Sequence, residues 1–192
     1  HDADGSWSGV VPQNLEGYLY TYSIEGPRSA HTSFDANQPV LDPWALAVKE
    51  GCAVVVDKQK VLKKAPAPFA APAYEDLIIA EAHVRDLIEK APIELTPAEK
   101  RGYAGVKKLL ESKLVKDPLE NLGVTAVEIQ PMAEFDVGGE TYHWGYMPIA
   151  FMAPYSGYAS NPAALSQIEE TQQMVAAFHN KGMAVIADVV FN

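Results

Sequence analysis

Residues 182–192 read GMAVIADVVFN, an apolar run rich in Val and Ile that contains a single charge, Asp188. A short run that is apolar on both faces predicts a fully buried strand of a parallel sheet. Side chains alternate along a strand. One face would then carry Ala184, Ile186, Asp188, Val190 and Asn192, and the other, packed beneath helices, Met183, Val185, Ala187, Val189 and Phe191. The stretch therefore favours a parallel α/β fold.

Asp188 stands near the carboxyl end of this predicted strand. Burying a carboxylate is costly unless it is paired or hydrogen-bonded, and enzymes with parallel strands place their active sites at that end. A functional Asp188 and a structural one that caps the following loop are both consistent with the stretch taken alone.

Composition and charge narrow the class of protein. The chain has 192 residues, 48% hydrophobic and 21% charged, which is an ordinary globular balance. A net charge of −10 argues against nucleic acid as a partner, because nucleic acid is bound by basic patches. No run approaches the roughly 20 apolar residues of a membrane-spanning helix, so no membrane partner is expected.

The start of the chain and its single cysteine say little about the cellular location of the protein. The chain opens on His1 without a signal-peptide pattern, so its start is expected to be a processed or cut end. Secreted, periplasmic and cytoplasmic locations all stay open. Cys52 excludes an intrachain disulfide and is expected to be a small buried apolar residue.

The first part of the chain has β character. Residues 7–24 alternate, with Tyr18, Tyr20, Tyr22 and Ile24 on one face, which predicts the last hairpin of a β domain. The aromatic row could pack in a core or interface, or stack on sugars. A Pro- and Ala-rich connector follows at 64–75 and marks a domain boundary, so we expect units at 1–63, 64–75 and 76–192.

The last unit alternates strands and helices. Strands are expected at 76–86, 124–130 and 183–191, with Glu128 and Gln130 on one face of the second. Helices are expected from the capping box at 96–99 to about Lys116 and from the capping box at 166–169, and a further short helix is expected to stop at Gly123. The first strand carries Glu81, His83 and Arg85 on one face, which suits either a solvated edge strand or a barrel strand. The second helix would bury Ile168, Met174, Val175, Ala177 and Phe178.

An aromatic-rich loop is predicted over residues 131–164. Loops of this length are uncommon unless they serve a function, and aromatic rings stack well on the C–H faces of sugars. The alternative is a loop folded over its own small core. Its carboxylates, Glu134 and Asp136, are interpreted as solvated charges.

Several motifs resemble family-13 glycoside hydrolases, the α-amylase superfamily. The DVVFN of 188–192 is similar to the family's first short motif, D-V-V-x-N-H. Nearly the whole chain resembles the isoamylase and type I pullulanase branch, the α-1,6 debranching enzymes. The matching segments are LDP at 41–43, EAHVRD at 81–86, GVTAVEIQP at 123–131, YHWGYMP at 142–148 and YASNP at 158–162. Ala80 and Gln130 depart from the pattern, which has Tyr and an aliphatic residue there.

The resemblance implies a fold and a set of binding residues. The fold would be the first three strands of a (β/α)8 TIM barrel, preceded by the end of an immunoglobulin-like β-sandwich. Tyr146 would be an aromatic platform for the sugar, Asp188 would lie at the floor of the same subsite, and Asn192 would anchor the next loop. His143 and Trp144 of the YHWGYMP motif are also assigned to substrate binding. No metal is expected, because debranching relatives often lack the calcium of other amylases, and no other cofactor is implied.

The implied function is hydrolysis of α-1,6 branch links in starch, glycogen or pullulan with retention of configuration. Retention needs two carboxyl groups about 5–5.5 Å apart, and the family places them after later barrel strands. No catalytic residue is therefore assigned here, the rest of the same polypeptide is an expected partner, and this chain alone is expected to be inactive. An α-1,4-acting amylase, a branching transferase and a non-catalytic glucan-binding protein remain alternatives.

Overall fold

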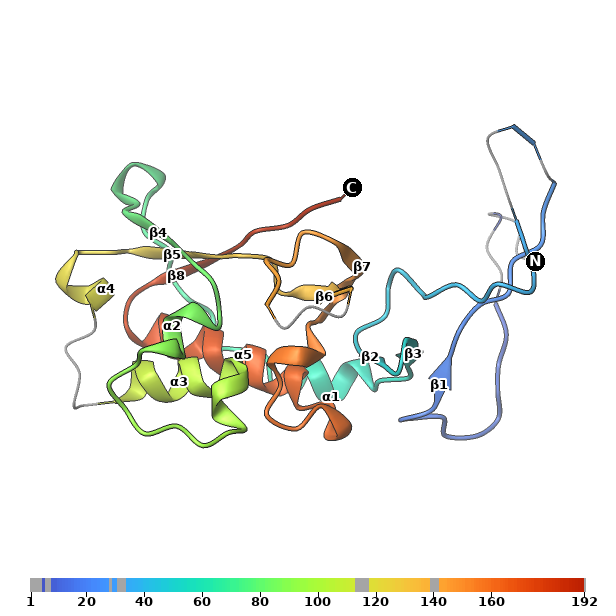
Figure 1. Ribbon diagram of the computed structural model, residues 1–192, viewed down its shortest axis with the longest axis horizontal. Coiled ribbons are helices and arrows are strands. Elements are labelled where there is room, and N and C mark those ends of the chain that lie inside the picture. The colour runs from blue at the N-terminus through green and yellow to red at the C-terminus, as the bar shows by residue number, and fades with distance from the viewer. Residues whose placement is uncertain are drawn as a thin grey trace.

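The computed structural model describes residues 5, 8–27, 29–30, 34–112, 118–138 and 142–191. Its centre is a parallel sheet of β4 (Ile79–Ala82), β5 (Ala126–Ile129) and β8 (Ala184–Ala187), in the order β4-β5-β8 (Figure 1). Ile79 pairs with Ala126, and Ala126 pairs with Ala184. The prediction of a parallel α/β arrangement is confirmed.

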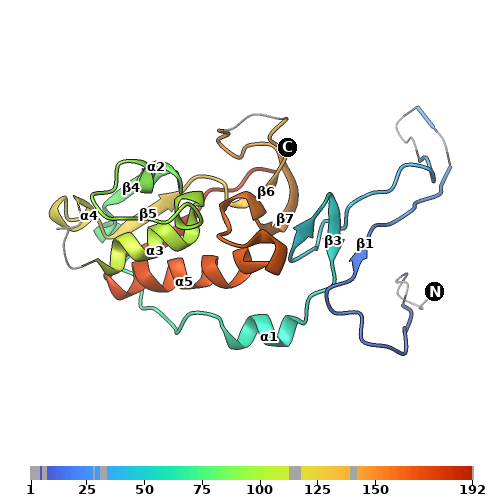
Figure 2. The same cartoon turned by 60° about the horizontal axis from the view of Figure 1, so that its bottom comes forward.

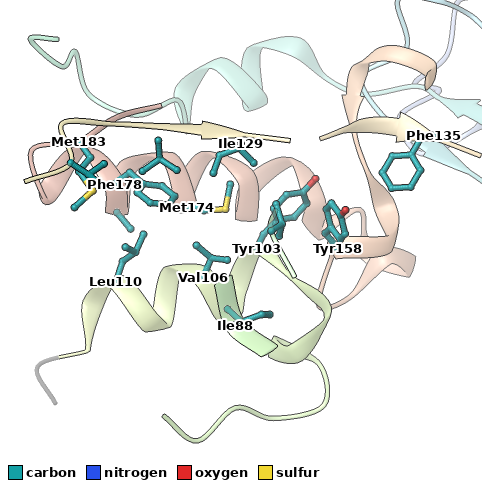
Figure 3. Packing of buried hydrophobic residues seen from close by; sticks show 14 residues of the cluster. Ile88, Tyr103, Val106, Leu110, Ile129, Phe135, Tyr158, Met174, Phe178 and Met183 are labelled. Atoms are coloured by element: carbon teal, nitrogen blue, oxygen red, sulfur yellow. The ribbon is translucent and has the colours of Figure 1, made fainter. Parts of the chain in front are cut away.

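Helices cover one face of this sheet. α3 (Tyr103–Glu111) and α5 (Ser166–Asn180) pack against each other on that side, and the short α2 (Asp86–Glu89) adjoins α3 (Figures 1 and 2). The core between helices and sheet is built from large apolar side chains that include Tyr103, Val106, Leu110, Ile129, Met174, Phe178 and Met183 (Figure 3). The residue just before α3 is Gly102, and a larger residue would not fit there, because its Cβ would lie 2.7 Å from the Cβ of Tyr158.

The other face of the sheet carries the polar residues. Val127, Ile129 and Val185 point into the helix-covered core. By alternation, the opposite side presents a set of exposed or half-buried residues that we call the open face: Ile79, Glu81, Glu128, Gln130, Ile186 and Asp188. The predicted sharing of one face by Glu128 and Gln130, and by Ile186 and Asp188, agrees with these strands.

The last strand is shorter than predicted and is not fully buried, since Ala184, Val185 and Ile186 are half-buried and Ala187 is exposed. β8 ends at Ala187, and Val189 and Phe191 are exposed by 57% and 74%. Its partner β5 ends at Ile129, just before Pro131, so the sheet offers no further ladder after the bond from Asp188 N–H to the Ile129 carbonyl. Among the described residues β5 is the one neighbour of β8, and β8 does not extend past its end.

The two predicted capping boxes have different outcomes. Thr96 and Glu99 exchange both bonds, at 2.7 and 3.3 Å, but they open a 3₁₀ turn at Glu99–Arg101, and α3 begins only at Tyr103. The predicted end of that helix near Lys116 lies outside the described residues. α4 (Pro118–Asn121) then ends before Gly123, as expected.

The box at 166–169 is wrong in detail. Ser166 lies inside α5, after Leu165 in the left-handed conformation, and its Oγ accepts from Asn161 N–H. The buried stripe of α5 also differs from the prediction. Ile168 and Val175 are only half-buried, and the buried residues are Gln167, Glu170, Met174, Ala177 and Phe178.

The aromatic segment 131–164 is more ordered than a loop. It contains the antiparallel pair β6 (Ala133–Phe135) and β7 (Pro148–Pro154), then 3₁₀ turns at Ser156–Tyr158 and Pro162–Ala164. Phe135 and Tyr158 join the main core rather than a separate small core of the segment. β7 also packs through Ala150 and Ala153 against Val48 of β2, which connects it to the N-terminal region.

The N-terminal region forms only a small antiparallel sheet. β1 (Leu19–Tyr20), β2 (Val48–Lys49) and β3 (Cys52–Val54) pair in the order β1-β3-β2, and Tyr22 bridges Val40. The predicted β character of 7–24 is thus confined to a few residues. Tyr20 donates to Asp42 Oδ2 at 2.6 Å and packs edge-on against Tyr22. Cys52 is half-buried rather than buried.

A strap joins this region to the helical layer. It comprises α1 (Lys58–Lys63), whose amino end is capped by Asp57, and the Pro- and Ala-rich connector at 64–75. The strap runs along α5 (Figure 2). It is fixed by the Lys64–Glu169 ion pair at 2.6 Å and by Phe69, which stacks on His179 at 4.3 Å. In the part of the chain that the structure describes, every helix is too short or too polar to cross a bilayer.

Candidate functional site

Tyr146 and Asp188 meet at the carboxyl edge of the parallel sheet. Tyr146 lies between β6 and β7, Asp188 directly follows β8, and the Tyr146 hydroxyl donates to Asp188 Oδ2 at 2.7 Å. This bond, then burial, then the charges of Asp188, Glu81 and Glu128 raise the pKa of Tyr146 to about 12. The phenol therefore keeps its proton at neutral pH and stays a hydrogen-bond donor.

This contact bears on the two interpretations of Asp188. The described side-chain bond of Asp188 goes to an aromatic residue 42 positions away in sequence, at the strand end where parallel-sheet enzymes bind ligands. The bond therefore joins Asp188 to the segment between β6 and β7.

His83 connects the end of β4 to the segment that carries Tyr146. Its Nδ1 accepts from Arg85 N–H at 3.2 Å, which places the ring proton on Nε2. Nε2 faces the Tyr158 hydroxyl at 2.8 Å and the His143 carbonyl at 3.2 Å. Burial lowers the pKa of His83 despite the nearby Asp86 carboxylate, so the ring is neutral at pH 7.

The segment around Tyr146 is held by its own short contacts. His143 Nδ1 accepts from Gly145 N–H at 2.9 Å, and its ring stacks on Phe135 at 5.4 Å. Gly145 has φ +90, and a Cβ there would lie 2.7 Å from the Pro131 carbonyl oxygen. His143 is thus largely a part of the frame that positions Tyr146.

An aromatic pocket opens beside the Tyr146–Asp188 pair. Its volume is about 400 Å³, and it is lined by Tyr142, His143, Trp144, Tyr146 and Met147. Trp144 is 61% exposed, so its indole face is accessible. Tyr142 is oriented by a bond from its hydroxyl to Asp86 Oδ2 at 3.1 Å. Four of the five predicted binding residues therefore gather here or next to it. The fifth, Asn192, lies outside the described residues.

Two features of the site were missed by sequence reasoning. Gln130 Nε2 donates to Glu81 Oε1 at 2.8 Å across β4 and β5, and a hollow of about 310 Å³ lies between this pair and His83. The only signal in the sequence was the presence of polar residues on one face of both strands. Which of them would meet depends on the strand register.

Glu134 is not the solvated charge that was predicted. It is buried and accepts from both the N–H and the Oγ of Ser156 at 2.8 Å, and burial raises its pKa. Asp136 is exposed as expected and accepts from Gly138 N–H. Within the described ranges, the structure has no cluster of three or more His, Cys, Asp or Glu side chains that could hold a metal ion.

Comparison with known proteins identifies the class. No family model matches the chain. A glycogen debranching enzyme of Cronobacter sakazakii is 30% identical over 218 aligned positions, which cover 97% of this chain and 32% of that protein. The glycogen operon protein GlgX homolog of Mycobacterium tuberculosis is 39% identical over 127 positions, which cover 62% of this chain and 17% of that protein. The chain thus spans about a third or less of the length of these relatives.

Solved structures give the same answer. A pullulanase from Anoxybacillus sp. LM18-11 matches with a TM-score of 0.73 at 26% identity, over 95% of this chain and 27% of that one. A pullulanase from Bacillus acidopullulyticus matches with a TM-score of 0.67 at 29% identity, over 93% of this chain and 23% of that one. The resemblance predicted from the motifs is confirmed: the chain is homologous to glycoside hydrolases. Its homologues are, more narrowly, the glycogen debranching enzymes and pullulanases of family 13.

Proposed function

We propose that this chain is the amino-terminal portion of a hydrolase that cleaves α-1,6 branch links in α-glucans with retention of configuration. The observation that carries the proposal is the Tyr146–Asp188 pair beside an exposed aromatic pocket at the carboxyl edge of a parallel sheet. Sequence and structural similarity to debranching enzymes and pullulanases supports it.

In this proposal, residues 1–63 end a β module of the immunoglobulin-like kind, residues 64–75 connect, and residues 76–192 provide the first three βα units of a TIM barrel. A glucose ring would stack on Tyr146, with Asp188 accepting hydrogen bonds at the floor of the subsite and Trp144 extending the aromatic surface. His143 would act by shaping the segment, and Asn192 by anchoring the following loop. One pullulanase among the structural neighbours is complexed with maltotetraose, which supports a linear glucan as ligand.

The chemistry itself would lie in the rest of the polypeptide. A retaining hydrolase uses one carboxylate as nucleophile and a second as acid and base, about 5–5.5 Å apart. Glu134 is engaged with Ser156, and Asp188 with Tyr146, so neither is assigned that role. The contribution of this chain is to bind and orient the sugar on one side of the cleft.

The test uses the full-length protein that carries this chain, with release of reducing ends measured on pullulan and on amylose. Hydrolysis of pullulan but not of amylose is the expected result, and NMR of the first product should show the α-anomer. Cleavage of amylose alone would indicate an α-1,4 enzyme. Binding without hydrolysis would indicate a glucan-binding protein, and either result would overturn the proposal.

A further inference from the structure

The imidazole of His83 lies between the end of β4 and residues 142–147, which we call the pocket segment because they line the aromatic pocket. His83 follows β4 directly and is only 3% exposed. Its Nδ1 accepts from Arg85 N–H at 3.2 Å, and its Nε2 lies 3.2 Å from the His143 carbonyl oxygen, 60 positions away in sequence. The ring therefore contacts its own strand end through one nitrogen and the pocket segment through the other.

The partners of the ring fix the direction of the second bond. Because Nδ1 receives a proton from Arg85 N–H, the neutral ring carries its own proton on Nε2. A carbonyl oxygen only accepts, so Nε2 donates to His143. The Tyr158 hydroxyl, 2.8 Å from the same nitrogen, is a competing partner for this proton.

The pocket segment is connected to the His83 ring at more than one point. The His143 carbonyl faces His83, and the His143 ring accepts from Gly145 N–H at 2.9 Å, one residue before Tyr146. The Tyr142 ring, which lines the same pocket, packs against the His83 ring at 4.9 Å. A shift of the His143 carbonyl should therefore move the aromatic side chains of the pocket together.

We infer that His83 is a positioning residue: it donates from Nε2 to the His143 carbonyl and so holds the pocket segment where its aromatic side chains bind sugar. The geometry stands on the hydrogen bonds and the ring contact given above. The effect on sugar binding rests on the proposed function. Without the bond only a fraction of the molecules would hold the segment in place, and the apparent affinity would fall by that fraction.

Two neutral amides separate the roles of the two ring nitrogens. The amide of Gln reaches about as far as Nε2, so His83→Gln keeps a donor for the His143 carbonyl. The amide of Asn reaches only about as far as Nδ1, so His83→Asn loses that donor and keeps an acceptor for Arg85 N–H. In the full-length protein, affinity for maltotetraose should stay within about twofold of wild type in His83→Gln and fall about fivefold in His83→Asn, the factor that corresponds to one hydrogen bond.

Calorimetric titration well below the melting temperatures of all variants measures this effect on folded protein. Equal losses of affinity in the two variants, or no loss in His83→Asn, would mean that the ring only packs in the core, and would overturn the inference. The matched control is His179→Asn, because His179 is also a half-buried or buried type of histidine but packs on Phe69 and does not line the pocket. It should leave the affinity unchanged.

Tyr158→Phe tests the competing partner. The change removes the hydroxyl that lies 2.8 Å from Nε2 and leaves the aromatic ring in the core. If Nε2 serves the His143 carbonyl, the affinity should not fall. A loss of about fivefold would mean that His83 acts through Tyr158, and would overturn the inference even if His83→Asn did not fold.

Crystal structures of the full-length proteins keep two failures distinct. If the wild-type protein binds no maltotetraose and cleaves no pullulan, the proposed function fails. The comparison of wild type with His83→Asn then still decides the role of His83, since the pocket segment should be displaced from the end of β4 in the variant. An unchanged position of the His143 carbonyl would overturn the inference whatever the protein binds.

Discussion

The Tyr146 hydroxyl and the Asp188 carboxylate depend on each other for their geometry. Asp188 raises the pKa of the phenol, and the phenol supplies the donor that a half-buried carboxylate needs. Because the pair joins the β6–β7 segment to the end of β8, it sets the position of the aromatic ring relative to the sheet. Tyr146 both positions the aromatic surface and forms part of it, so we expect the removal of its hydroxyl oxygen alone to weaken sugar binding.

Tyr146→Phe removes only that hydroxyl. Hydrogen bonds to charged groups contribute about 1.5–3 kcal/mol, so maltotetraose affinity of the full-length protein should fall roughly 10- to 100-fold, since each 1.4 kcal/mol is tenfold. Calorimetric titration would measure it. Tyr74→Phe is the control, because Tyr74 is 90% exposed on the connector and should bind as the wild type does. An unchanged affinity for Tyr146→Phe would contradict the role given to the pair.

His83 should make stability depend on pH. Burial lowers its pKa in the folded protein, so below its unfolded value of about 6.5 the unfolded chain binds the proton more readily. Stability should therefore fall as the pH drops from 7 to 5, and His83→Gln should flatten that slope. Thermal unfolding at several pH values would measure it.

His179 is the control for this effect. Burial lowers its pKa too, but its ring is only half-buried beneath Phe69, so His179→Gln should remove a smaller part of the slope. Glu134 acts in the opposite direction because its pKa is raised, and it stays unchanged in both variants. A His83→Gln protein with the full wild-type slope would rule out His83 as the source.

Among the elements, the β6–β7 ribbon depends on one buried carboxylate. Glu134 of β6 holds the turn after β7 through the N–H and the Oγ of Ser156. Ser156→Ala would leave one buried carboxylate oxygen without its donor, and such losses cost about 1–3 kcal/mol. The melting temperature should fall. Ser166→Ala removes an exposed bond to Asn161, so it should lower the melting temperature less. Equal losses in the two variants would mean that Glu134 finds other hydrogen-bond partners when Ser156 is changed.

The first turn of α5 contains a buried polar side chain that makes no side-chain hydrogen bond to the described residues. Gln167 is fully buried, and both of its amide atoms lack a partner among the described residues. Unpaired buried polar groups are destabilising, and an apolar group of similar shape removes that cost. Gln167→Met should therefore raise the melting temperature, whereas Gln173→Met on the exposed side should not. A lower melting temperature for Gln167→Met would reveal a hidden partner.

The elements also differ in how well the sequence predicts them. The positions of the strands could be predicted from apolar runs such as 184–187, although that run is half-buried or exposed rather than fully buried. The length of β8 could not, since it depends on where β5 turns away. β6 and β7 were not predicted because β6 has only three residues and the register of the pair shifts twice. The residues that we propose as the sugar site were assigned by motif, whereas the Glu81–Gln130 contact could not be predicted, because it depends on the register of β4 and β5.

At the scale of the whole molecule, the chain exposes apolar surface. Apolar side chains of the open face and of the segment after β8, such as Ile79, Val189 and Phe191, are exposed. Contiguous exposed apolar surface and an unpaired strand edge promote association. Expressed alone, the chain should bind a hydrophobic dye and form oligomers in size-exclusion chromatography. A monodisperse preparation with a cooperative melting transition would show that this surface is tolerated.

The strap attaches the amino-terminal sheet to the helices that cover the parallel sheet. Since Lys64 and Phe69 fix the connector along α5, the β1–β3 sheet is attached through more than a flexible linker. The packing of β2 against β7 adds a second attachment. Movement of the amino-terminal sheet should therefore be transmitted to the ribbon that carries Tyr146.

The parallel register has a consequence in time. Ala126 of β5 pairs with Ala184 of β8, 58 positions later in the chain. At synthesis rates of about 5–20 residues per second, β5 emerges roughly 3–12 s before its second partner. During that interval one strand edge at the centre of the sheet is open to any other chain nearby. The ribosome's pace, and any chaperone that shields β5 meanwhile, therefore contributes to how much of this protein reaches its folded state.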